Sequence, residues 1–283
     1  MSSSLLARTL ALPRVLALSC HPVPSVAVSA LSAGLAALAH LPVGRGVLVT
    51  ATVFTGQLSI GWSNDYLDAD RDRAVGRSDK PVAAGAVAPR VAAVAAAAAL
   101  ISTLALSAGL GWGGGTTALV IVLCGWLYNL GLKSTAWSWL PYAIAFGTLP
   151  AVATLSGSPS RWPAAWALTA GALFGVAAHL ANVLPDLRED LATGVRGLPH
   201  RLGARATALT GAALLLTVSA VILFGPGDQP GRWRWAGFVT AVLMAGTAAT
   251  TAYRDPSSRR FFLATILIVA LNLVFFALSG TRL

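Results

Sequence analysis

One polar pattern occurs twice in this chain and contains most of its acidic residues. Both copies read Asn-x3-Asp-x3-Asp-x3-Gly; the first runs from Asn64 to Gly76 and the second from Asn182 to Gly194. The chain has only ten acidic residues, and eight lie in or beside these copies: Asp65, Asp68, Asp70, Asp72, Asp79, Asp186, Glu189 and Asp190. Two matched carboxylate clusters in a chain so poor in acid indicate one shared cation site.

The four-residue spacing predicts that each copy forms a row on one helix face, because residues four apart stack along a helix. The first row would hold Asn64, Asp68 and Asp72, with Asp65 at its edge. The second row would hold Asn182, Asp186 and Asp190. Asp70 and Glu189 fall off the rows, and we expect both to be solvated.

Each row would be unstable without a compensating cation. Two carboxylates about 6 Å apart repel by about 3 kcal/mol at an effective dielectric of ~20. No His or Cys stands at ligand spacing beside the rows, which argues against zinc or copper. Mg²⁺ fits better, because it binds one or two carboxylates together with water and substrate phosphate oxygens.

Basic residues follow both rows and suggest the ligand that the cation would share. Arg77 and Lys80 come after the first row, and Arg196 comes after the second. Lys133 follows the apolar run that ends near Tyr128, and it could reach a phosphate or simply mark the cytoplasmic side. Carboxylates, Mg²⁺ and Arg or Lys side chains together can hold a diphosphate.

The elements that carry these residues are predicted to be membrane helices. Only 11% of the residues are charged and the mean hydropathy is +0.72, whereas soluble domains carry about 25% charged residues. Nine apolar runs are separated by turn-rich segments, at about 22–41, 45–63, 91–110, 114–131, 137–156, 163–184, 204–225, 233–252 and 261–280. Because a spanning segment must satisfy its own backbone hydrogen bonds, we predict an all-α polytopic membrane protein with about nine transmembrane helices.

The basic residues predict the orientation of these spans. With the N-terminus in the cytoplasm, the inner side holds Arg8, Arg14, Arg71, Arg73, Arg77, Lys80, Arg90, Lys133, Arg188, Arg196, Arg201, Arg205, Arg254, Arg259 and Arg260. The outer side holds only Arg45, Arg161, Arg232, Arg234 and Arg282. This asymmetry follows the positive-inside rule and places both acidic segments on the cytoplasmic face. Since the positive charge lies in short segments between apolar runs, it does not indicate a nucleic-acid partner.

The chain is predicted to form one transmembrane domain over residues 1–283. Residues 22–131 and 137–252 could be diverged halves, followed by a ninth helix. We expect the first apolar run to be retained as a span rather than removed with a signal peptide. Cys20 and Cys124 lie far apart in apolar runs and predict neither a disulfide nor a zinc site. Arginine outnumbers lysine eighteen to two and alanine is abundant, which suggests a GC-rich bacterial genome, so we expect a bacterial cell membrane.

Three segments resemble signatures of the UbiA superfamily of intramembrane prenyltransferases. NDYLDADRD at 64–72 and GRSDKPVAAG at 76–85 are similar to the first signature, and PDLREDLATG at 185–194 is similar to the second. The Tyr128-x4-Lys133 ending and the nine-span layout are similar too. The resemblance therefore covers essentially the whole chain.

This resemblance implies a UbiA-type helical bundle around a central cavity that opens laterally to lipid. It implies two Mg²⁺ ions that bind an isoprenyl diphosphate through Asn64, Asp68, Asp72, Asp186 and Asp190, and Asp65 is counted with these metal ligands. Asp68, Asp72, Asp186 and Asp190 are the expected catalytic residues. The expected diphosphate contacts are Arg77, Lys80, Lys133, Arg196, Asn182 and Tyr128. One departure is Arg196-Gly197, where many members carry a lysine.

The predicted reaction is Mg²⁺-dependent transfer of an isoprenyl group to a hydrophobic, aromatic or quinone-precursor acceptor, with release of diphosphate. One alternative is a terpene cyclase of the same superfamily, in which a double bond of the substrate itself attacks. The other alternative is a cation-coupled transporter, which predicts acidic residues deep within the spans. Asn272, in the middle of the ninth run, could be functional or could bond a neighbouring helix.

Overall fold

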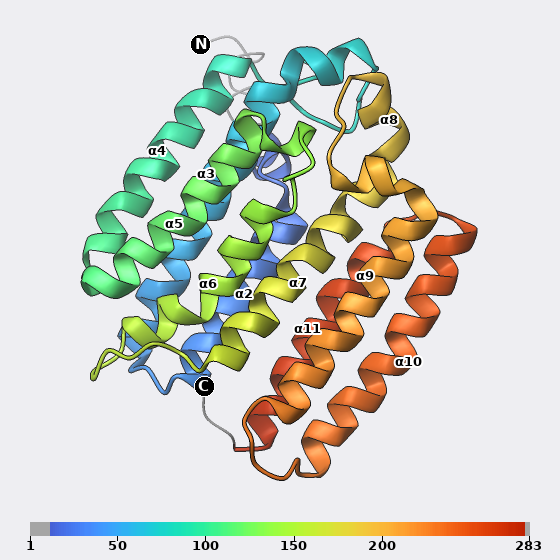
Figure 1. The fold of residues 1–283 in the computed structure, drawn as a ribbon. Coiled ribbons are helices and arrows are strands. Elements are labelled where there is room, and N and C mark those ends of the chain that lie inside the picture. Colours follow the sequence, from blue (N-terminus) through green and yellow to red (C-terminus); the bar gives the residue numbers. More distant parts are fainter. Residues whose placement is uncertain (1–11, 281–283) are drawn as a thin grey trace.

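The computed structural model describes residues 12–280, and no strand occurs in this range (Figure 1). A short helix at Leu12–Ser19 precedes the bundle. The helices that follow are α2 (Pro22–Leu38), α3 (Val43–Ala74), α4 (Pro89–Ala108), α5 (Gly111–Leu130), η1 (Leu132–Ser134), α6 (Leu140–Leu155), α7 (Ala165–Val183), η2 (Leu184–Asp186), α8 (Leu187–Ala192), α9 (Leu198–Phe224), α10 (Arg232–Arg254) and α11 (Arg260–Leu278). Arg8 and Arg282, which belong to the predicted charge asymmetry, lie outside the described residues.

The long helices within residues 12–280 coincide with the nine predicted apolar runs, and the all-α membrane fold is confirmed. Six of them are long and apolar enough to cross a membrane: α4, α5, α7 with its extension to Ala192, α9, α10 and α11. A seventh is reached if α2 and the helix before it, which meet at 71°, form one broken span. The number of nine spans stays a prediction, because α6 has only 16 residues and α3 continues past residue 63 into the polar motif.

The bundle brings both polar motifs to one end. α3 packs against α4, α6 against α7, α7 against α9, and α10 against both α9 and α11. Figure 1 shows α8 at the same end of the bundle as the C-terminal end of α3. The first motif therefore faces the second, although more than a hundred residues separate Asp72 from Asp186.

The second row differs from the prediction in its backbone, because Asn182, Asp186 and Asp190 are not carried by one regular α-helix. α7 ends at Val183, a 3-10 turn follows from Leu184 to Asp186, and α8 starts at Leu187. Pro185 lies in this turn, where it cannot donate the backbone hydrogen bond that a continuing α-helix needs. The first row forms as predicted, because α3 runs unbroken through Asn64, Asp68 and Asp72.

Glycines allow α6 and α7 to pack with their backbones close together. A Cβ atom on Gly175 would collide with the carbonyl of Tyr142, and one on Gly171 would collide with the carbonyl of Phe146. Small residues spaced by four are the usual means of close helix approach in membranes. This contact fixes where α6 presents Tyr142 and Phe146, whose side chains line cavities described below.

Replacing Gly175 with alanine is therefore expected to destabilise the bundle by about 1–3 kcal/mol, because the backbones of α6 and α7 would have to separate. Gly246→Ala in α10 is the matched control, since nothing lies within 4 Å of its Cβ position. That control should be neutral or stabilising by up to about 1 kcal/mol. Thermal unfolding of both variants in detergent checks this, and equal melting temperatures would contradict it.

Candidate active site

A cavity of about 450 Å³ lies where the two motifs meet. Its walls come from the end of α3 and the loop after it, from the turn between α7 and α8, and from the starts of α2 and α11. Eleven of the twelve predicted site residues line it: Asn64, Asp65, Asp68, Asp72, Arg77, Lys80, Tyr128, Lys133, Asn182, Asp186 and Asp190. The structure thus brings the two motifs together, while the roles of these side chains stay predictions.

The carboxylate of Asp68 lies at the centre of the first row. It is buried and pairs with Lys133 from η1, and Arg71 Nη2 lies 2.7 Å from its Oδ2. Asn64 Nδ2 donates to the same Oδ2 at 3.1 Å and to Asn129 Oδ1 at 3.1 Å. Because Asn129 belongs to α5, this contact fixes the α3 row against a second helix.

Lys80 returns from the loop after α3 to the same row. Its Nζ lies 2.8 Å from Asp72 Oδ2 and 3.4 Å from Asn64 Oδ1. Asp65 is more weakly compensated, with His21 Nε2 at 3.4 Å and Lys80 Nζ at 3.9 Å from its Oδ1. Both carboxylate oxygens of Asp65 are buried, and neither has a hydrogen-bond partner among the described residues.

Arg77 connects the two motifs. Its Nη1 lies 2.8 Å from Glu189 Oε2 and 3.5 Å from Asp186 Oδ1, and its Nε donates to Asp79 Oδ1 at 2.9 Å. The hydrogen bonds with Asp79 raise the pKa of Arg77 and lower the pKa of the Asp79 carboxyl. Arg77 therefore stays charged and holds the loop after α3 against α8. Glu189, predicted to be simply solvated, is half exposed and takes part in this bridge.

The donor set fits Mg²⁺ when a substrate supplies further ligands. Within residues 12–280 no three His, Cys, Asp or Glu side chains lie close enough to hold a metal ion by themselves. Mg²⁺ does not require such a cage, because it normally adds water and phosphate oxygens to one or two carboxylates. Asp68 and Asp72 on one wall, Asp186 and Asp190 on the other, and the unbonded oxygens of Asp65 supply oxygen ligands only.

Two cationic side chains could exchange their present partners for phosphate oxygens. Lys133 and Lys80 now neutralise Asp68 and Asp72. Burial lowers the pKa of Lys133, and the neighbouring Asp68 opposes that shift. A bound diphosphate would offer both lysines charge-assisted hydrogen bonds of the same kind as those they now make with the carboxylates.

Sequence reasoning missed several residues around the cavity and misplaced one. Arg259 lines the cavity from the loop before α11, and His200 Nε2 lies 3.3 Å from Asp190 Oδ2. Neither belongs to a motif, so only the fold could identify them. Arg196 is exposed and does not line the cavity; its carbonyl accepts a hydrogen bond from Arg201 Nε at 3.2 Å. The predicted diphosphate contact of Arg196 thus has no support in the geometry.

We expect Arg259 to bind the anionic substrate. Arg259→Gln should raise the KM for a prenyl diphosphate about tenfold, since a charge-assisted hydrogen bond contributes about 1.5–3 kcal/mol. Arg254→Gln is the matched control, because Arg254 is exposed at the end of α10 and does not line the cavity. Steady-state kinetics with both variants checks this, and an unchanged KM for Arg259→Gln would contradict it. Arg196→Gln, measured in parallel, tests the prediction from the sequence that Arg196 contacts the diphosphate.

Two further cavities continue from the polar one into the bundle. A middle chamber of about 180 Å³ shares Asn64, Tyr128 and Asn182 with the polar cavity. A smaller pocket of about 80 Å³ shares Phe146 and Leu149 with the middle chamber. The three cavities therefore adjoin in order: the polar cavity at the motif end, then the middle chamber, then the small pocket.

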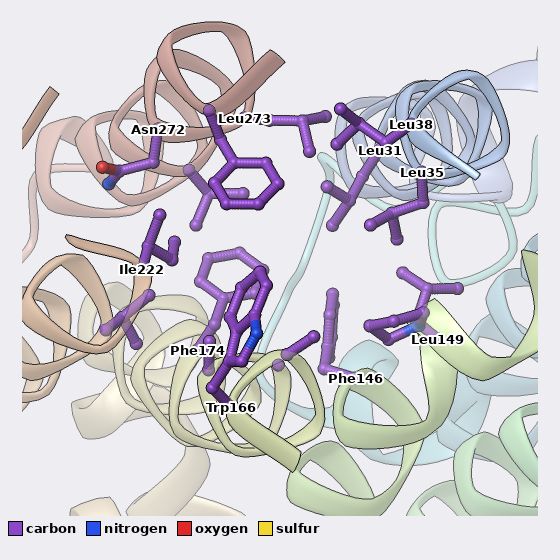
Figure 2. Close-up of a pocket in the computed structure, with 17 residues that line it drawn as sticks. Leu31, Leu35, Leu38, Phe146, Leu149, Trp166, Phe174, Ile222, Asn272 and Leu273 are labelled. Carbon is purple, nitrogen blue, oxygen red and sulfur yellow. The ribbon is translucent and has the colours of Figure 1, made fainter. Parts of the chain in front are cut away.

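Apolar side chains from several helices surround the small pocket. Figure 2 shows leucines of α2, Phe146 of α6, Trp166 and Phe174 of α7, and Leu273 of α11 around it. Asn272 also lines it, and its Nδ2 donates to Ser219 Oγ in α9 at 2.9 Å. Asn272 thus bonds a neighbouring helix, which was one of its two predicted roles.

Comparison with known proteins gives a family match and several similar folds. The protein-family model described as the UbiA prenyltransferase family matches residues 24–279 of the chain. The structure of a UbiA homologue from Aeropyrum pernix K1 superposes with a TM-score of 0.72 at 18% identity, covering 88% of this chain and 96% of that one. A UbiA homologue from Archaeoglobus fulgidus, bound to GPP and Mg²⁺, gives 0.70 at 14% identity, covering 93% and 99%.

A digeranylgeranylglyceryl phosphate synthase gives a TM-score of 0.66 at 16% identity, covering 94% of this chain and 98% of that one. No curated protein sequence matches the chain. At these identities the solved structures show the shared fold alone.

Proposed function

Since the chain belongs to the UbiA prenyltransferase family, we propose that it transfers an isoprenyl group from a prenyl diphosphate to an acceptor within the membrane, with Mg²⁺ as cofactor. Family membership confirms the resemblance and the prediction of a prenyltransferase. The observation that carries the proposal is the convergence of four motif aspartates and several Lys and Arg side chains on one cavity. A homologue of the same fold binds GPP and Mg²⁺, which supports the same donor class here.

The side chains of this cavity have separable roles in the proposed reaction. Asp68, Asp72, Asp186 and Asp190 would hold Mg²⁺, which when bound neutralises the charge that develops on the leaving diphosphate. Arg77, Lys80, Lys133 and Arg259 would bind the diphosphate oxygens and keep the allylic carbon at the mouth of the middle chamber. The arrangement stabilises the leaving group more as its charge grows, which is how such sites accelerate bond breaking.

One bond breaks and one bond forms at the allylic carbon in the proposed reaction. The allylic C–O bond breaks, and its electron pair leaves with the diphosphate. A nucleophilic atom of the acceptor bonds to the allylic carbon, and the proton it loses passes to the released diphosphate. The largely apolar walls of the inner cavities keep water from capturing the prenyl group first.

The acceptor that we propose is an aromatic or quinone-precursor compound. We also propose that the polar cavity faces the cytoplasm of a bacterial cell, with the N-terminus on the same side. The bias of Lys and Arg toward that side of the bundle supports this orientation. Exposed apolar residues at the starts of α2 and α11, Val23 and Leu263, line the polar cavity, which supports access for the prenyl chain from lipid.

The test uses purified full-length protein in detergent with geranyl diphosphate and a panel of aromatic acceptors. We expect diphosphate release and a prenylated product with Mg²⁺, and neither after EDTA treatment. A cyclic hydrocarbon or alcohol formed without any acceptor would instead support the cyclase alternative. Absence of both diphosphate release and Mg²⁺-dependent substrate binding would overturn the proposed function.

A further inference from the structure

The middle chamber differs chemically from the cavities on either side of it. The polar cavity is lined by Asp, Lys and Arg, and the small pocket is lined almost entirely by apolar side chains. Among the described residues that line the middle chamber there is no Asp, Glu, Lys or Arg. Its polar lining consists of amides, hydroxyls and one histidine, and of these Gln57, Tyr128, Tyr142 and Asn182 come from four different helices.

These four polar groups are available to a ligand. Neither the amides of Gln57 and Asn182 nor the hydroxyls of Tyr128 and Tyr142 form a hydrogen bond with any described residue. By contrast, Asn129 in the same wall bonds Asn64, Ser63 and the carbonyl of Ile60. Polar groups in a membrane protein normally find partners within the bundle, because lipid offers none. Tyr128 and Asn182 also line the polar cavity, where a diphosphate could bind them, but Gln57 and Tyr142 line the middle chamber and not the polar cavity. Their polar groups, without a partner among the described residues, indicate that a molecule bound in the chamber supplies one.

Gln57 is placed to contact a molecule that reacts at the polar cavity. It lies seven residues before Asn64 in α3, so the two side chains share a helix face. The axial rise between them is about 10 Å. A ring-sized molecule that hydrogen-bonds Gln57 at one end would therefore extend toward Asn64, where the middle chamber meets the polar cavity.

We propose that the middle chamber binds the acceptor, and that this acceptor is an uncharged molecule whose hydroxyl or carbonyl group is hydrogen-bonded by Gln57. The proposal rests on the proposed function and adds the substrate class. Among the described residues the chamber wall offers a carboxylate no Lys or Arg, and its one histidine, His21, already lies 3.4 Å from Asp65 Oδ1. An acceptor carboxylate buried here would therefore lack a cation of its own, which is strongly unfavourable. The prenyl chain has no polar group for Gln57, so it is the poorer occupant of this chamber. During transfer a nucleophilic atom of the acceptor bonds to the allylic carbon, and the electron pair of the broken C–O bond leaves with the diphosphate. The proton that the acceptor loses passes to the diphosphate.

The experiment compares acceptors of matched ring structure, one member of each pair uncharged and the other carrying a carboxylate. Full-length protein with geranyl diphosphate and Mg²⁺ is assayed with uncharged phenols and naphthols and with their carboxylated counterparts, such as methyl 4-hydroxybenzoate against 4-hydroxybenzoate. We expect transfer to uncharged members, with at least tenfold higher kcat/KM than to the carboxylated partner. Preference for the carboxylated partners, or transfer to no uncharged member, overturns the proposal.

A pair of variants tests the role of Gln57. Gln57→Leu should raise the KM for the uncharged acceptor about tenfold while the KM for geranyl diphosphate stays unchanged, because one hydrogen bond to the acceptor is lost. Gln229→Leu is the control, since the chain's other glutamine is exposed in the loop before α10. An unchanged acceptor KM in Gln57→Leu, or equal changes in both KM values, overturns the role of Gln57. Mg²⁺-dependent binding of geranyl diphosphate, measured separately, shows whether the proposed function itself has failed.

Discussion

Replacing Asp68 with asparagine is expected to lower the rate of diphosphate release by about 10²–10³-fold, the usual cost of removing one group that stabilises transition-state charge. Asp68 is the most heavily compensated carboxylate of the first row, with Lys133, Arg71 and Asn64 all on it. Asparagine keeps the size of the side chain and removes its charge. The prediction is checked by single-turnover release of diphosphate from geranyl diphosphate with Mg²⁺.

The control for this substitution lies two residues away. Asp70 is in the same motif, but its side chain is 97% exposed and, among the described residues, pairs only with Arg73. Asp70→Asn should therefore retain activity within about threefold, since an exposed ion pair contributes about 0–1 kcal/mol. If both variants lost activity equally, the general negative charge of the motif would explain the effect, and the assigned role of Asp68 would be wrong.

Replacing Asp186 with asparagine is expected to have an effect of the same size, about 10²–10³-fold, although it lies on the opposite wall. Asp186 lies in the turn between α7 and α8, 3.5 Å from Arg77 Nη1. The loss should appear in kcat and should not be recovered at high substrate concentration. Single-turnover kinetics at saturating geranyl diphosphate measures it.

The neighbouring Glu189 provides the control for Asp186. It also pairs with Arg77, at 2.8 Å, but its side chain is 53% exposed and does not line the cavity. Glu189→Gln should keep most of the activity. A large loss in Glu189→Gln with a small loss in Asp186→Asn would show that positioning of Arg77, and not the carboxylate in the cavity, is what the second motif supplies.

The sequence allowed the long helices and both motifs to be identified because each depends on local signals. Runs of apolar residues define membrane helices by length alone, and spacing by four places Asn64, Asp68 and Asp72 on one face. The backbone of the second motif was harder to predict, because the motif has the same spacing as the first but Pro185 interrupts the helix. Pro185 is the local signal of this break, because proline cannot donate the backbone hydrogen bond that a continuing α-helix needs.

Other parts of the site depend on contacts that only the fold creates. Arg259 lines the polar cavity from the loop before α11 and His200 of α9 lies beside Asp190, and nothing in the local sequence of either residue marks it. Arg196 is the opposite case. Its position after the second motif predicted a contact with the diphosphate, but its side chain does not line the polar cavity. Gln57 belongs to no motif, and only the fold identifies it, by placing its amide in the wall of the middle chamber without a hydrogen-bond partner among the described residues.

We propose that the two motifs form one site for one diphosphate. A double-mutant cycle on Mg²⁺-dependent diphosphate release, with Asp68→Asn, Asp186→Asn and the double variant, shows whether they act together. Groups that act as a unit give strongly non-additive losses. We predict that the double variant is scarcely slower than either single variant. Losses that multiply across the two substitutions would contradict the claim, because they would show that the motifs act independently.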